Sequence, residues 1–81
     1  MTIEILGTGC KKCNQLEANA RAAADKLGIP YELRHVTDLN KIASYGVLMT
    51  PGLAIDGRVK LTGKVASEAE LTALFTSALA K

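Results

Sequence analysis

Residues 7–13 read GTGCKKC, a glycine-rich loop that runs into the only two cysteines of the chain, Cys10 and Cys13. The first turn of a helix brings two thiols at this spacing to one side, so their sulfurs can close into a disulfide and reopen by exchange. This segment therefore predicts a redox-active pair that works by covalent exchange, with no metal and no cofactor.

The segments on either side of the cysteines have clear and different periodicities. Thr2–Leu6 alternates polar and apolar residues, which predicts a short strand ending in the glycine loop. From Lys11 to Leu27 the apolar residues recur every three or four positions, which predicts an amphipathic helix. Gly28 and Pro30 then provide a strong stop signal. The strand and its glycine loop therefore place the two cysteines at the start of this helix.

The middle of the chain predicts an edge strand, a short helix and a hairpin. Tyr31–Val36 alternates with a charged face, and Asp38 can cap a helix over residues 39–45. Two strands, residues 52–55 and 58–62, flank Asp56 and Gly57, a pair that tolerates the positive φ of a tight turn.

A last helix is predicted from a capping box, Ser67 with Glu70, and from an apolar stripe. The stripe consists of Leu71, Leu74, Phe75, Ala78 and Leu79. The order of elements is βαβαββα, which predicts an α/β fold with a four-stranded mixed sheet and helices on both faces. We expect residues 1–81 to form a single domain, which we also expect to be a monomer.

Composition excludes several classes of function. The chain has 81 residues, 48% of them hydrophobic, a formal net charge of +2 and only three aromatic residues (two Tyr, one Phe). We therefore expect no nucleic-acid partner, because neither a basic footprint nor stacking platforms are present. No long apolar run or leader pattern is visible, so we expect no membrane partner and a cytoplasmic location. In that reducing compartment, a lone cysteine pair points to redox or metal work.

The two cysteines are expected to have different roles. Cys13 lies on the apolar stripe of its helix with Leu16 and Ala20, so it should face the core, whereas Cys10 sits at the helix opening. Cys10 is therefore the expected nucleophile, and Cys13 the expected resolving thiol. Helix amides, Lys11 and Lys12 would favour the thiolate of Cys10. The two lysines have a second interpretation as a solvated helix start.

The chain resembles the thioredoxin superfamily, in particular its small redox-active disulfide proteins of about glutaredoxin size. The likeness covers nearly the whole chain, and it implies a minimal thioredoxin fold and thiol-disulfide oxidoreductase activity. The stretches that carry it are residues 7–13, Val36–Asp38, Tyr45–Val47, Thr50–Leu53 and Asp56 with Gly57.

The resemblance also implies roles for other residues. Pro51 would be cis and would face the disulfide, and the backbone of Thr50 would pair with a substrate segment. Glu4, six residues before Cys10, matches by count a buried acid that takes the proton of Cys13. A surface carboxylate is the alternative interpretation of Glu4.

Three further residues have expected roles outside the exchange chemistry. Met49 and Tyr45 are expected to pack around the Pro51 loop rather than to contact substrate. His35 is expected to have a surface or structural role, because it is on a predicted edge strand far in sequence from the cysteines.

The expected partners follow from the exchange chemistry. The substrate would be a protein or small molecule with a disulfide, and the pair would be recycled by a thioredoxin-reductase-like enzyme or a low-molecular-weight thiol. The alternative function is a soft-metal carrier that holds Cu(I) between the same two thiolates. Two features disfavour it: Thr8 stands where that family usually has methionine, and the chain ends in the helix that starts near Ser67.

Overall fold

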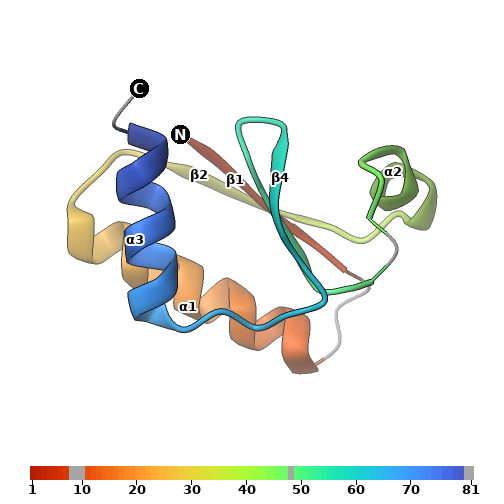
Figure 1. Cartoon of the computed structure of the whole chain (residues 1–81), viewed down its shortest axis with the longest axis horizontal. Coiled ribbons are helices and arrows are strands. Elements are labelled where there is room, and N and C mark those ends of the chain that lie inside the picture. The colour runs from red at the N-terminus through yellow and green to blue at the C-terminus, as the bar shows by residue number, and fades with distance from the viewer. Residues whose placement is uncertain (8–10, 48, 80–81) are drawn as a thin grey trace.

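The computed structural model describes residues 1–7, 11–47 and 49–79, and the elements in them follow the predicted order (Figure 1). Two boundaries differ from the prediction, because the second strand begins at Glu32 and the second helix ends at Ser44. The elements are β1 (Thr2–Leu6), α1 (Lys11–Leu27), β2 (Glu32–Val36), α2 (Leu39–Ser44), β3 (Gly52–Ile55), β4 (Arg58–Thr62) and α3 (Glu68–Leu79).

The strands form a mixed sheet in the order β2-β1-β3-β4 within the described residues. β1 pairs in parallel with β2, and β3 pairs antiparallel with both β1 and β4. This register defines two opposite ends of the sheet. The cysteine end comprises Leu6, Val36, Gly52 and Thr62, and the hairpin end comprises Thr2, Glu32, Ile55 and Arg58.

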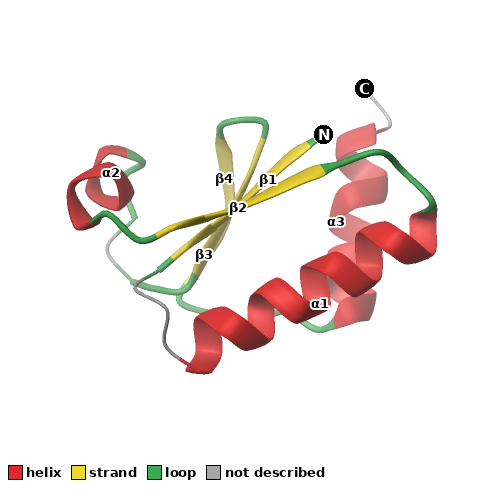
Figure 2. Ribbon diagram, turned by 180° about the vertical axis from the view of Figure 1, so that it is seen from behind, coloured by secondary structure: helices red, strands yellow, loops and turns green. Residues whose placement is uncertain are grey.

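Helices cover both faces of the sheet, which confirms the predicted fold class. α1 and α3 pack against each other on one face, and α2 lies apart from both (Figures 1 and 2). Ile3 and Ile5 of β1 contribute to the larger apolar cluster, with Leu16, Leu71 and Phe75 from the two helices. Burying each large apolar side chain contributes about 1.5–3 kcal/mol, so this face supplies most of the stability.

The second face carries a smaller apolar cluster, built around α2. Its buried members are Leu6, Val36, Ile42, Val47 and Ala54. Asp38 caps α2 by accepting a hydrogen bond from the Asn40 amide, as the sequence predicts. Among the described residues, no helix is long and apolar enough to cross a bilayer.

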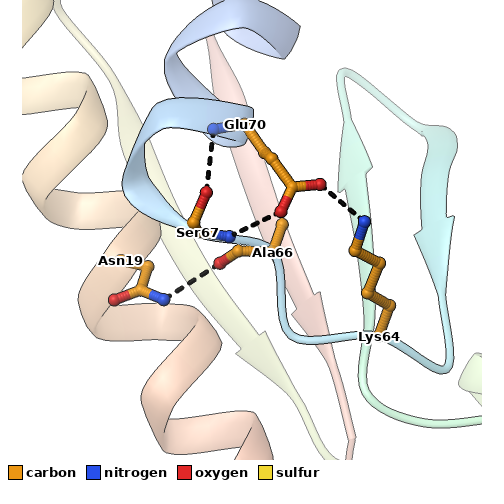
Figure 3. Close-up of polar contacts among 5 residues, drawn as sticks. All are labelled: Asn19, Lys64, Ala66, Ser67 and Glu70. Atoms are coloured by element: carbon orange, nitrogen blue, oxygen red, sulfur yellow. Dashed lines mark hydrogen bonds and ion pairs between the residues drawn. The ribbon is translucent and has the colours of Figure 1, made fainter.

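α3 begins as predicted, but its last turn does not match the predicted stripe. Ser67 Oγ accepts from the Glu70 amide at 3.2 Å, and Glu70 Oε1 accepts from the Ser67 amide at 3.3 Å (Figure 3). Leu71 and Phe75 are fully buried, but Leu79 is 51% exposed. The buried part of the stripe therefore stops before Leu79, which lies on the same side of the helix as Phe75 but is the last residue of α3.

The hairpin end is closed by the turn that the sequence predicts. Asp56 and Gly57 have φ of 50° and 84°, as a tight antiparallel connection requires. The Thr2 amide donates to Asp56 Oδ1 at 2.8 Å, and the Asp56 amide donates back to the Thr2 carbonyl at 2.8 Å. The turn is therefore fastened to the first strand.

Candidate functional site

Cys13 is fully buried in the first turn of α1, where its sulfur lies against the backbone of Gly7. A Cβ built on Gly7 would overlap Cys13 Sγ and would lie 3.8 Å from the Thr50 Cβ. The Gly7 amide donates to the Val36 carbonyl at 2.9 Å, so the chain is fixed there and cannot easily move aside. Gly7 thus provides the space that the sulfur occupies, and only glycine fits.

The loop before β3 lies at the same end of the sheet. The Thr50–Pro51 peptide bond is cis, Pro51 is buried and Thr50 is exposed. The Gly63 amide donates to the carbonyls of both Pro51, at 2.8 Å, and Met49, at 3.1 Å. The cis-proline loop is therefore tied to the end of β4, and the structure brings Cys13, Thr50 and Pro51 together at the cysteine end.

Met49 presents apolar surface beside this loop. It is 66% exposed, and a Cβ on Gly63 would lie 3.0 Å from its Cβ. Its side chain thus lies over Gly63 and is otherwise open to solvent. Met49 therefore lies against the residue that holds the loop, but most of its side chain stays exposed.

Glu4 is the one charged side chain that is buried among the described residues, with 6% exposure. Tyr45 donates its hydroxyl to Glu4 Oε1 at 2.7 Å. This hydrogen bond raises the pKa of Tyr45, and burial raises it further, because an acceptor carboxylate and a dry environment both disfavour the phenolate. The surface interpretation of Glu4 was therefore wrong.

Glu4 projects to the face of the sheet that α2 covers. Along β1 it alternates with Ile3 and Ile5, which pack under α1, and it pairs with Ala54, which belongs to the cluster around α2. Tyr45 is the C-cap of α2, so its hydroxyl ties this helix to the strand that leads into the cysteines. Tyr45 thus packs against the cluster around α2 and also holds a polar contact that was not foreseen.

Lys11 and Lys12 are exposed at the start of α1, as the sequence predicts. Neither lysine forms an ion pair with an acidic side chain in the described ranges. With Gln15 and Val65 they line an open pocket of about 370 Å³. Cys10, the expected nucleophile, lies outside the described residues.

His35 joins β2 to α1 rather than reaching the cysteine end. Its Nδ1 lies 3.1 Å from Glu17 Oε1, and its side chain is 21% exposed. The buried Nε2 has no hydrogen-bond partner among the described residues. This is the structural role that the sequence favours.

Two contributors to the site were missed by sequence reasoning. Gly7 was assigned only to a tight loop, although a glycine six residues before a core-facing cysteine is a signal that could have indicated close approach. The contact between Tyr45 and Glu4 spans 41 residues and has no local signal.

Comparison with known proteins gives consistent matches. Residues 1–76 match the family model of the thioredoxin domain. The thioredoxin of Methanothermobacter thermautotrophicus is 45% identical over 71 residues, which are 88% of this chain and 92% of that protein. The thioredoxin of Methanocaldococcus jannaschii is also 45% identical over 71 residues, which are 88% of this chain and 81% of that protein. No match favours a soft-metal carrier.

Proposed function

Because this chain belongs to the thioredoxin family and is a thiol-disulfide oxidoreductase, we propose that it exchanges disulfides through a reversible bond between Cys10 and Cys13. The observation that carries this proposal is the placement of Cys13. Its sulfur is buried at the start of α1 against Gly7, beside Thr50 of the cis-proline loop. A buried thiol in that place suits the second step of an exchange, in which the attack comes from within the protein.

In the first step, the Cys10 thiolate attacks one sulfur of a substrate disulfide. A bond forms between Cys10 and that sulfur, the substrate disulfide breaks, and the departing thiolate takes a proton from water. The amides at the start of α1 favour the Cys10 thiolate, and Lys11 and Lys12 add positive charge nearby.

In the second step, Cys13 loses its proton and attacks the Cys10 sulfur. The Cys10–Cys13 disulfide forms, the mixed disulfide breaks, and the second substrate sulfur leaves as a thiolate. Two electrons pass to the substrate, which becomes a dithiol. We assign the proton of Cys13 to Glu4, directly or through water, since Glu4 is a buried carboxylate on the strand that precedes the cysteines.

Substrate is bound, in this proposal, by the cis-proline loop. Thr50 is exposed beside Gly7, and its backbone would pair with an extended substrate segment. Pro51 has no N–H that competes for that pairing. The exposed side chain of Met49 supplies apolar contact.

The partners and the setting complete the proposal. The substrate is a disulfide-containing protein or small molecule, and a thioredoxin-reductase-like enzyme or a low-molecular-weight thiol returns the two electrons. We place the protein in the cytoplasm as a monomer with one domain over residues 1–81. Such a setting keeps the thiols reduced between turnovers.

Turnover of a peptide disulfide, with dithiothreitol as the reductant, tests the proposal. We expect Cys10→Ser to slow reduction to the rate of dithiothreitol alone, because the attacking sulfur is missing. His35→Gln is the matched control, since His35 lies outside the proposed machinery, and it should keep the normal rate. Unchanged turnover in Cys10→Ser would contradict the proposal.

A further inference from the structure

We propose that the pocket at the start of α1 selects substrate polypeptides that carry an acidic side chain close to the reacting cysteine. This inference rests on the proposed function and adds a substrate class to it. The pocket has a volume of about 370 Å³, and it is lined by Lys11, Lys12 and Gln15 of α1 and by Val65 from the segment between β4 and α3. Lys11 and Lys12 stand between Cys10 and Cys13 in the sequence, so the pocket lies at the first turn of α1, in which Cys13 is buried.

The wall of the pocket is held in place by a chain of hydrogen bonds. Gln15 donates to Asn19 Oδ1 at 3.0 Å, and Asn19 donates to the Ala66 carbonyl at 2.9 Å. Figure 3 shows how Asn19 reaches from α1 to Ala66, at the point where the chain enters the capping box of α3. Val65 is thus fixed opposite Gln15 before any substrate arrives, which reduces the ordering cost of binding.

The positive charge of Lys11 and Lys12 is not neutralised by Glu70, the acidic side chain at the start of α3. Glu70 pairs with Lys64 and accepts from the Ser67 amide, so its charge is already engaged (Figure 3). Lys11 and Lys12 have no acidic partner in the described part of the chain. A carboxylate from outside can therefore pair with them without breaking an existing contact.

The pocket also has room for the apolar part of a glutamate side chain. Its lining is mainly apolar, to which the side chain of Val65 and the methylene stems of Lys11 and Lys12 can contribute while the ammonium groups stay in water. The two methylenes of a glutamate can lie against that lining while its carboxylate reaches the ammonium groups. An uncharged glutamine would keep the apolar contact and lose the ion pair.

One wall of the pocket follows closely, along the chain, the residue that holds the cis-proline loop. Val65 follows Gly63 by two residues, and Gly63 contacts Met49 and donates to the Pro51 carbonyl. An extended substrate segment advances about 3.3 Å per residue, so positions within a few residues of the bound cysteine reach the pocket. One substrate strand can thus occupy the loop and place an acidic side chain between the lysines.

Two synthetic disulfide peptides test this inference. They differ at one position, two residues from the cysteine, where one has Glu and the other Gln, and kcat/KM is measured for each with dithiothreitol as the reductant. At low salt we expect the unaltered protein to prefer the Glu peptide about threefold, the size that a partly exposed ion pair supplies. The preference should fade as added salt screens the charges.

Variants assign the preference to the pocket. Lys11→Gln with Lys12→Gln should bring the ratio of the two kcat/KM values to one. Lys26→Gln with Lys60→Gln removes the same charge from the far end of α1 and from β4, and it should leave the ratio unchanged. Both peptides meet the same thiol, so the ratio is insensitive to any change in the reactivity of Cys10.

The outcomes separate the two proposals. Equal rates for the two peptides, or a preference that persists in Lys11→Gln with Lys12→Gln, would overturn the selection of acidic substrates and leave the redox function intact. A protein that reduces neither peptide beyond the rate of dithiothreitol would overturn both.

Discussion

The two ends of the sheet are built in opposite ways. At the hairpin end, Asp56 and Gly57 make a tight turn that is bonded twice to Thr2, and the backbone closes on itself. At the cysteine end, Thr50 and Met49 are left exposed, and a fully buried sulfur lies against Gly7. One end completes its contacts within the chain, and the other keeps surface available for a partner.

This difference shows where a small domain can place reactivity. The core between the sheet, α1 and α3 and the closed hairpin carry the stability, so the cysteine end can keep an exposed apolar side chain and a buried thiol. Substitutions at the cysteine end can therefore be compared with matched substitutions elsewhere in the molecule.

Gly7→Ala should have the largest effect, because the added Cβ would overlap Cys13 Sγ. We expect a loss of about 1–3 kcal/mol in the free energy of unfolding, the usual cost of overpacking, together with slow resolution of the mixed disulfide. Urea unfolding and stopped-flow exchange measure the two effects.

Gly57→Ala is the control for this change at the hairpin end. Nothing lies within 4 Å of its added Cβ, and its φ of 84° makes the cost one of backbone strain, about 1 kcal/mol. Exchange should stay normal in this variant. If Gly7→Ala also exchanged at the normal rate, the close fit between Gly7 and the sulfur would have no part in catalysis.

Tyr45→Phe should have the next largest effect, since it leaves the buried Glu4 carboxylate without its hydroxyl donor. We expect it to lower the free energy of unfolding by about 1–2 kcal/mol. Tyr31→Phe, which removes an exposed contact with Asp25, should change it little. Similar losses in the two variants would show that the contact with Glu4 has no special weight.

The same contact predicts a dependence on alkaline pH. The pKa of Tyr45 is raised above 10.0, so its contribution to stability is complete below pH 10 and is lost as pH rises through the folded-state value. Tyr45→Phe should therefore lose less stability than the unaltered protein above pH 10. Urea midpoints on both sides of pH 10 check this, and parallel losses in the two proteins would contradict it.

Glu4→Gln tests the proton assignment. The amide can still accept from Tyr45, but it cannot take a proton from Cys13, and general-base help is typically worth about 100-fold or more. Since water can partly replace Glu4, we expect a smaller loss in the second step, about tenfold, and a changed pH profile. An unchanged profile would remove Glu4 from the mechanism.

Glu70→Gln should have the smallest effect, at the start of α3. Its pKa is lowered chiefly by the hydrogen bond from Lys64 and then by the Ser67 amide, so the stabilisation is present above pH 4.5 and is lost as pH falls through the folded-state value. The variant should lose less stability than the unaltered protein between pH 6 and pH 3. Glu68→Gln is the control in the same turn, and it should retain the full acid dependence.

The sequence predicted the features of the fold that depend on local patterns of residues. The bounds of α1 match those expected, because its apolar period is regular and Gly28 ends it, and Ser67 with Glu70 starts α3 as a capping box should. Tertiary contacts between distant residues were not predictable in this way. The buried Glu4 is bonded to Tyr45, 41 residues further along, and Met49 lies against Gly63, 14 residues further along.

The most direct test is to trap the mixed disulfide. Cys13→Ser, mixed with excess peptide disulfide, should accumulate one covalent adduct, which mass spectrometry of the digested protein should locate at Cys10. Cys10→Ser should form no adduct while folded, because the remaining sulfur of Cys13 is fully buried. An adduct at Cys13 in folded Cys10→Ser, formed as fast as that in Cys13→Ser, would contradict the assignment of attacking and resolving thiols.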